Sequence, residues 1–369
     1  MLQLFFFASA VAVLALGHID LWFFLVKFLG IGASSGRFIL AVVLAFLFFS
    51  FIFVFWLIHK IDRRFTRAYY FLAVSWLGLL LHFYLAWLLV ALLRWGGRSF
   101  NFIFPDCFSK IAFFAGVILW SAYGFFNAFR TRVKKYTVAI MDLPPAWRGK
   151  TVVQISDLHL GPIYRRHFLA RLLERVAALK PAALFITGDL FDGLDSDFSW
   201  LNHPFNSLNL PQGIYYCFGN HELYLGFKRA QELISGNPIT LLDNKMAIVD
   251  GLQIIGLNYA FNRDFSATEE VLRQVGYNPK RPSLLMNHEP IHVKQAKDIG
   301  IGLQLSGHTH RGQLFPLNFL TKLAYRGYDY GLFKKGDFNL VVSSGVGSWG
   351  PPLRTSGRSE IVAIRLEGK

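Results

Sequence analysis

Long apolar runs fill the first third of the chain, and their lengths predict a membrane domain. A helix that crosses the hydrocarbon core of a bilayer needs about 20 apolar residues. Three runs meet this requirement; none contains Asp, Glu, Lys or Arg, and one contains His82. They are residues 38–58, 70–93 and 111–129.

A fourth apolar stretch, residues 2–30, is interrupted by His18, Asp20 and Lys27. We predict one spanning helix there, with a helical hairpin as the alternative. Polar groups inside a membrane sometimes mark a transport site. We interpret His18 and Asp20 as helix-end groups and His82 as an interhelical hydrogen-bonding group, because no repeated half or acid–base relay accompanies them.

The pattern changes near Tyr136, where short β-rich runs begin to alternate with helical periodicity. This alternation is typical of an α/β domain. We therefore divide the chain into a transmembrane domain of about four helices (1–129), a basic juxtamembrane linker (130–149) and a C-terminal domain (150–369). The predicted strands are residues 151–155, 183–187, 214–218, 253–257, 283–286, 341–344 and 361–366, and the predicted helix is 166–179.

Charge is concentrated beside the apolar runs. Residues 1–136 contain 13 of the 38 Lys and Arg residues but 3 of the 23 Asp and Glu residues, which gives +10 of the net +15. The basic stretches 59–67 and 130–135 fit the cytoplasmic side of a four-helix arrangement. Both termini and the C-terminal domain are then cytoplasmic, and the charge suits anionic lipids better than nucleic acid. The two cysteines, Cys107 and Cys217, predict neither a disulfide framework nor a thiolate zinc site.

Five short polar motifs follow the apolar runs of the C-terminal domain. In an extended chain, Asp157 and His159 point to one side, as do His308 and His310. Ligands of α/β sheets bind outside the carboxyl ends of strands. Carboxylate, imidazole and amide groups together suit Mn, Fe or Zn. In order, the motifs are Asp157-Leu158-His159, Gly188-Asp189, Gly219-Asn220-His221-Glu222, His288 and Gly307-His308-Thr309-His310.

This ordered set resembles the signature of the calcineurin-like metallophosphoesterases over about residues 150–366. The stretches 154–161 and 345–354 are similar to those of bacterial membrane-associated members, a branch that includes UDP-2,3-diacylglucosamine pyrophosphatases. The resemblance implies a four-layer αββα sandwich and two divalent ions, with Mn²⁺ expected and Fe or Zn as alternatives. By resemblance, one ion is held by Asp157, His159 and His310, the other by Asn220, His288 and His308, and Asp189 bridges both.

Other residues near the motifs have expected or open roles. By resemblance, His221 faces the substrate and protonates or stabilises the leaving oxygen, and Glu222 orients it. Asp192 is a weaker candidate. Arg311 and Arg354 are either phosphate contacts or solvated surface cations. The sequence departs from the branch at Arg311, where glycine is common, and at Ser359, where proline is common.

The expected function is hydrolysis of a phosphoester or pyrophosphate bond by metal-activated water, on a lipid-linked or membrane-proximal substrate such as a UDP-sugar lipid. The expected location is the inner membrane of a bacterium, with the bilayer as a partner. Alternatives are a non-catalytic metal-binding membrane scaffold, a phosphodiesterase of soluble nucleotides, a nuclease and a transporter with a regulatory domain. The segments 318–323 and 325–333 are either a lipid-facing entrance or packing.

Overall fold

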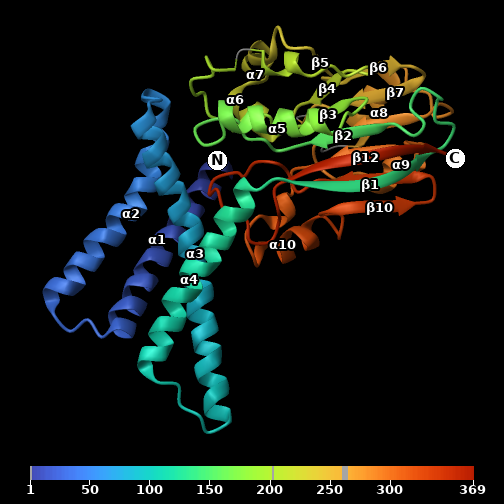
Figure 1. Ribbon diagram of the computed structural model, residues 1–369. Helices are drawn as coiled ribbons and strands as arrows, with labels where there is room; N and C mark the ends of the chain where they lie inside the picture. The colour runs from blue at the N-terminus through green and yellow to red at the C-terminus, as the bar shows by residue number, and fades with distance from the viewer. Residues whose placement is uncertain (1, 202, 260–264) are drawn as a thin grey trace. The chain divides into compact units, whose positions relative to one another are not determined.

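The computed structural model describes residues 2–201, 203–259 and 265–369, and the chain divides into two compact units. The helical unit is Met1–Phe125 and the catalytic unit is Phe126–Lys369. Figure 1 shows long helices in the first unit and two sheets in the second. Each unit is described below by itself.

Four helices of the first part of the chain are long and apolar enough to cross a membrane, which confirms the predicted helices. The stretch that allowed a hairpin forms a single helix that continues through Gly17 in its middle, because a turn there would expose backbone groups to lipid. The helices are α1 (Leu2–Leu29), α2 (Ser34–Lys60), α3 (Arg64–Ser99) and α4 (Asp106–Phe129).

The polar side chains of the helical unit bond from one helix to another. The Trp76 indole donates to Nε2 of His18 at 2.8 Å, which joins α3 to α1. His82 Nδ1 lies 2.8 Å from the Ser121 hydroxyl, which joins α3 to α4. Such bonds satisfy polar groups that lipid cannot hydrate. These contacts give His18 and His82 a packing role.

Two six-stranded sheets form the centre of the catalytic unit. The first has the order β1-β12-β2-β3-β4-β5 and the second β10-β11-β9-β8-β7-β6. The strands of the first sheet are β1 (Arg132–Ile140), β2 (Thr151–Ile155), β3 (Leu184–Thr187), β4 (Ile214–Cys217), β5 (Ile239–Leu241) and β12 (Glu360–Gly368). Those of the second are β6 (Lys245–Val249), β7 (Leu252–Gly256), β8 (Ser283–Met286), β9 (Leu303–Ser306), β10 (Gly331–Lys335) and β11 (Phe338–Val342).

Apolar side chains fill three layers around these sheets. Residues of both sheets, such as Phe185, Met286 and Leu305, share one buried core, so the sheets pack face to face. A second core lies between the first sheet and α5, and a third between the second sheet and helices α8 and α9. This confirms the four-layer α/β sandwich. The helices of the catalytic unit are α5 (Arg166–Ala178), α6 (Asn220–Leu225), α7 (Phe227–Ile234), α8 (Phe265–Gln274), α9 (Val293–Asp298) and α10 (Leu317–Ala324).

Strand direction determines where polar residues gather. Strands β2, β3 and β4 run parallel in the first sheet, and β7, β8, β9 and β11 run parallel in the second. Parallel strands end at the same edge, and loops leave from there. The five polar motifs follow β2, β3, β4, β8 and β9, so the topology brings them to these strand ends.

The segment expected to be a linker contains a strand of the catalytic unit. β1 pairs in parallel with β12 from Arg132 opposite Glu360 to Ile140 opposite Gly368. Trp147 is fully buried and donates to the Val249 carbonyl at 2.9 Å. Basic residues are typical of a sheet edge, where they discourage pairing with other chains, and here they resembled a juxtamembrane signal. Two residues, Arg130 and Thr131, separate α4 from β1.

Candidate metal centre

The predicted ligands meet in two groups, and one carboxylate lies close to both. Donor atoms of Asp157, His159 and His310 lie within 4.8 Å of one another, and so do those of Asp189, His288 and His308. Asp189 also lies within 4.8 Å of His159 and His221 in a third such group. The carboxylate of Asp189 therefore lies between the two sets.

Nitrogen and oxygen atoms converge closely within these groups. In the first, His159 Nε2 is 3.1 Å from His310 Nε2, which is 3.4 Å from Asp157 Oδ1. In the second, His288 Nε2 is 3.2 Å from Asp189 Oδ2, 3.2 Å from Asn220 Oδ1 and 3.1 Å from His308 Nδ1. All seven predicted ligands thus lie at this centre. Buried lone pairs that face one another at these distances suit bound cations.

Five of these residues have a left-handed backbone. A non-glycine residue in this region costs about 1–2 kcal/mol, and such strain clusters at functional sites. Here it occurs where a strand ends and the next side chain must turn back toward the centre. The residues are Asp157 (φ 54°), His159 (50°), Asp189 (51°), His308 (68°) and His310 (47°).

Two glycines allow the loops to approach one another. A Cβ on Gly219 would collide with Oδ1 and the backbone N of Asp189. A Cβ on Gly307 would collide with the side chains of Ser156 and Asp157. Glycine is thus needed at both positions because backbone packs against a ligand.

The two central carboxyl groups differ in their electrostatics. Burial raises the pKa of Asp157 to about 6, against the lowering effect of His288. Burial alone would raise the pKa of Asp189, but His288 and His221 hold it well below its usual range. A negative charge is thus favoured on the shared carboxylate. Together with the converging imidazoles, this donor set fits two divalent cations.

Each imidazole of the second group has an acceptor on the side away from the centre. His288 Nδ1 donates to the Thr187 carbonyl at 2.8 Å, which leaves Nε2 toward Asp189. His308 Nε2 lies 3.2 Å from Glu289 Oε1, which leaves Nδ1 toward His288. Such acceptors fix the tautomer and ring orientation of metal ligands.

Glu289 was not identified from the sequence, and Tyr325 was named there as part of the segment 325–333, without a role at the metal centre. Glu289 is largely buried, and the Tyr325 hydroxyl donates to its Oε1 at 3.3 Å. The position of Glu289 directly after His288 was the available signal. Its contact with His308, 19 residues later in the chain, depends on the pairing of β8 with β9.

His221 lies at the rim of the centre. Its backbone N–H donates to Asp189 Oδ1 at 2.9 Å, and its Nδ1 donates to the Asp192 carbonyl at 2.8 Å. Burial alone would lower the pKa of His221, but Asp189 and Asp192 raise it. The Asp192 carboxylate lies 3.6 Å from His159 Nδ1, and burial raises its pKa to about 7 against the effect of His221.

Glu222 has a different place from the one expected. We expected it to orient the His221 ring, but its carboxylate accepts backbone N–H groups of Gly219 (2.7 Å), Asp189 (2.9 Å) and Phe191 (3.1 Å). It is fully buried, and burial raises its pKa. Glu222 therefore joins the loops after β3 and β4.

The two arginines differ from each other. Arg354 is fully buried, and its guanidinium donates to the carbonyls of Ser344 (2.7 Å) and Gly347 (2.9 Å) and lies 3.0 Å from His310 Nδ1. Neither the surface nor the phosphate role predicted for Arg354 fits these contacts, because its donors are used inside the protein. Arg311 is exposed and stacks on Tyr330 at 4.6 Å, with φ 51°, a value that explains why glycine is common there.

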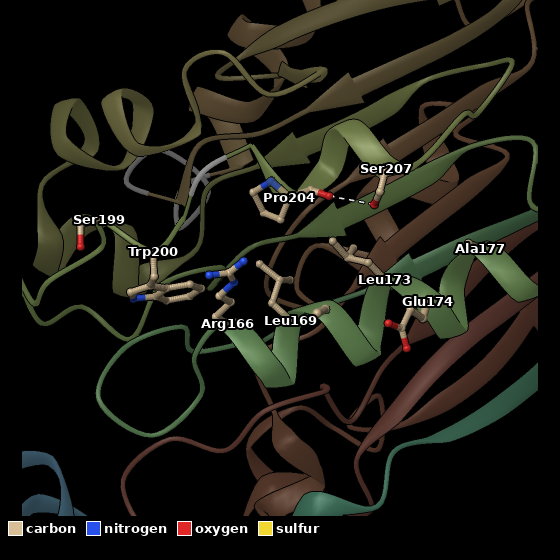
Figure 2. Close-up of a pocket in the computed structure, with 10 residues that line it drawn as sticks. Arg166, Leu169, Leu173, Glu174, Ala177, Ser199, Trp200, Pro204 and Ser207 are labelled. Atoms are coloured by element: carbon tan, nitrogen blue, oxygen red, sulfur yellow. Dashed lines mark hydrogen bonds between the residues drawn. The ribbon is translucent and has the colours of Figure 1, made fainter. Parts of the chain in front are cut away.

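A separate hollow of about 630 Å³ lies beside α5. Figure 2 shows Arg166, Leu169 and Leu173 on α5, with Trp200 and Pro204 lining the other side of the hollow. None of its lining residues belongs to the two ligand groups.

The contacts of Glu289 generate a prediction. Glu289→Gln should weaken metal binding by about 10–100-fold, because the amide no longer holds His308 with a charged acceptor. Bound metal is measured by titration of the full chain with Mn²⁺. Glu232→Gln on α7, which is exposed, is the matched control. Equal affinity in the two variants would contradict a positioning role for Glu289.

Comparisons with known proteins agree with this geometry. Residues 150–312 match the model of the calcineurin-like phosphoesterases. The chain is 31% identical to an uncharacterized metallophosphoesterase of Campylobacter jejuni, over 87% of this chain and 90% of that protein. It is 32% identical to a transmembrane protein with metallophosphoesterase domain of Danio rerio, over 67% of this chain and 60% of that protein. The chain therefore belongs to the calcineurin-like phosphoesterase family.

Proposed function

We propose that the catalytic unit hydrolyses a phosphoester or pyrophosphate bond with two divalent ions. Mn²⁺ is the proposed metal, and Fe or Zn are the alternatives. The observation that carries the proposal is that the Asp189 carboxylate lies within 4.8 Å of donor atoms of His288 and His308 and also of His159, which belongs to the other ligand group. In the proposal, Asp157, His159 and His310 hold one ion, Asn220, His288 and His308 hold the other, and Asp189 bridges them. When bound, such ions activate water and neutralise charge on the phosphoryl group.

His221 is the proposed proton donor. A carbonyl oxygen only accepts, so the contact with Asp192 assigns a proton to Nδ1 of His221. In the imidazolium form Nε2 also carries a proton, which it gives to the leaving oxygen, and the ring returns to the neutral form. The bonds from Nδ1 and from the backbone N–H hold the ring in place beside Asp189. This role differs from that of the seven ligands, which do not transfer protons.

The proposed substrate is lipid-linked or otherwise close to a bilayer, such as a UDP-sugar lipid. Support comes from the chain itself, since two residues join the apolar helix α4 to β1. A connection this short does not permit wide excursions from the membrane. A phosphodiesterase of soluble nucleotides has no corresponding observation in its favour.

Substitutions at Asp189 and His221 test this function. In detergent with Mn²⁺, the full chain should hydrolyse aryl phosphodiesters, and Asp189→Asn should lose the activity because the shared ligand is weakened. His221→Gln should keep its metal but lose about 10²–10⁴-fold in rate on substrates with alkyl leaving groups. Its loss on p-nitrophenyl esters should be smaller, because that leaving group needs no proton.

A panel of aryl phosphodiesters, nucleotides and sugar-lipid pyrophosphates measures these rates. Metal-loaded wild-type protein that turns over no member of the panel would contradict the enzyme proposal and favour the metal-binding scaffold. If His221→Gln lowered the rate equally for alkyl and p-nitrophenyl leaving groups, the result would contradict a proton-donor role for His221. Faster hydrolysis of the lipid-linked substrate in vesicles than of its soluble analogue is expected.

We also propose that the catalytic unit faces the cytoplasm of a bacterial inner membrane, because basic residues flank α2, α3 and the end of α4.

Labelling of single cysteines tests this orientation. In intact cells, a membrane-impermeant maleimide should label exposed Cys107, in the first turn of α4, from outside. In a Cys107→Ser background, Thr137→Cys on β1 should react after lysis alone. Labelling of Thr137→Cys in intact cells would reverse the orientation.

A further inference from the structure

Helix α10 has no buried residue, although half of its residues are strongly apolar. Phe319, Leu320 and Leu323 are 61%, 63% and 78% exposed. Their spacing of three and four residues places them on one side of the helix. The segments 318–323 and 325–333 were each expected to be either a lipid-facing entrance or packing. The large apolar side chains of 318–323 are exposed, whereas Tyr328 and Phe333 of 325–333 pack against the core.

A second segment adds an exposed aromatic residue beside the start of α10. Trp349 is 53% exposed. Its backbone N–H donates to Gln313 Oε1 at 3.1 Å, and Gln313 Nε2 donates back to the Trp349 carbonyl at 3.0 Å. Gln313 is itself buried, so this loop and the entry to α10 are held together. We call Phe319, Leu320, Leu323 and Trp349 the α10 patch.

We propose that the α10 patch docks on the surface of a bilayer that contains anionic lipids. Short amphipathic helices with apolar and basic side chains lie in the plane of the interface, and Trp is enriched there. Lys322 and Arg326 are exposed within and directly after the helix. Their charge is complementary to anionic headgroups.

The tether favours a bilayer over a second copy of the chain. Two residues separate the membrane helix α4 from β1, so the effective concentration of membrane surface near the catalytic unit is high. Two α10 patches placed against each other would bring together the like charges of Lys322 and Arg326. A single patch on anionic lipid has no such repulsion.

Docking at α10 would hold the metal centre near the headgroups. Tyr325, which follows the last residue of α10, donates to Glu289 at 3.3 Å, and Glu289 lies 3.2 Å from His308. The patch is thus joined to a predicted metal ligand by two side-chain contacts. Substrates whose phosphate lies at the membrane surface would reach the centre without leaving the lipid.

Lipid-borne quenchers test the proposal on the full chain. In a Cys107→Ser background, an environment-sensitive fluorophore is attached at Leu320→Cys, and the matched control is Ala178→Cys, at an exposed position of α5. In nanodiscs with phosphatidylglycerol and brominated lipids, we expect several-fold stronger quenching at 320 than at 178. Adding Lys322→Glu and Arg326→Glu should weaken the quenching at 320, as should replacement of phosphatidylglycerol by phosphatidylcholine.

Quenching at 320 that is no stronger than at 178 would overturn the proposal. Open access of aqueous iodide to the probe would then show an exposed patch, and protection from iodide would show a patch covered by protein. Protection that needs two chains in one disc would identify a second copy as the occupant. The readout does not depend on turnover, so it stands or fails separately from the proposed hydrolysis.

Discussion

The shared position of Asp189 constrains the rest of the catalytic unit. One carboxylate can lie close to both ligand groups only if loops from both sheets reach the same point. The face-to-face packing of the sheets and the common direction of β2, β3, β4, β8 and β9 provide this convergence. The left-handed residues and the glycines at 219 and 307 are the local consequences, since each loop must turn sharply and pass close to its neighbour.

Buried polar groups stabilise this strained arrangement. Glu222 accepts three backbone N–H groups from two loops, and Arg354 donates to carbonyls of the loop after β11 while touching His310. A buried charge is costly unless its partners surround it. Both groups therefore depend on the loops closing, and the loops depend on them. Neither residue needs to contact a substrate to matter for the centre.

The features that the sequence alone could predict are those that depend on neighbouring residues in the chain. The convergence of the candidate ligands was predictable because each motif follows a buried strand, and the four long apolar helices because lipid demands long apolar runs. The contacts of Arg354, Glu222 and Glu289 were not, since each depends on residues that the fold brings together from other loops. β1 was missed for a different reason: its basic residues belong to a sheet edge but resemble the flank of a membrane helix.

Electron paramagnetic resonance of the Mn²⁺-loaded full chain tests the central claim most directly, because two ions bridged by one carboxylate are magnetically coupled. The account predicts an exchange-coupled dimanganese spectrum for the wild type at two ions per chain. It also predicts that the coupling is lost in Asp189→Asn, whereas the matched change Asp298→Asn, at the exposed end of α9, retains it. A spectrum of isolated, uncoupled Mn²⁺ in the wild-type protein would contradict the shared centre.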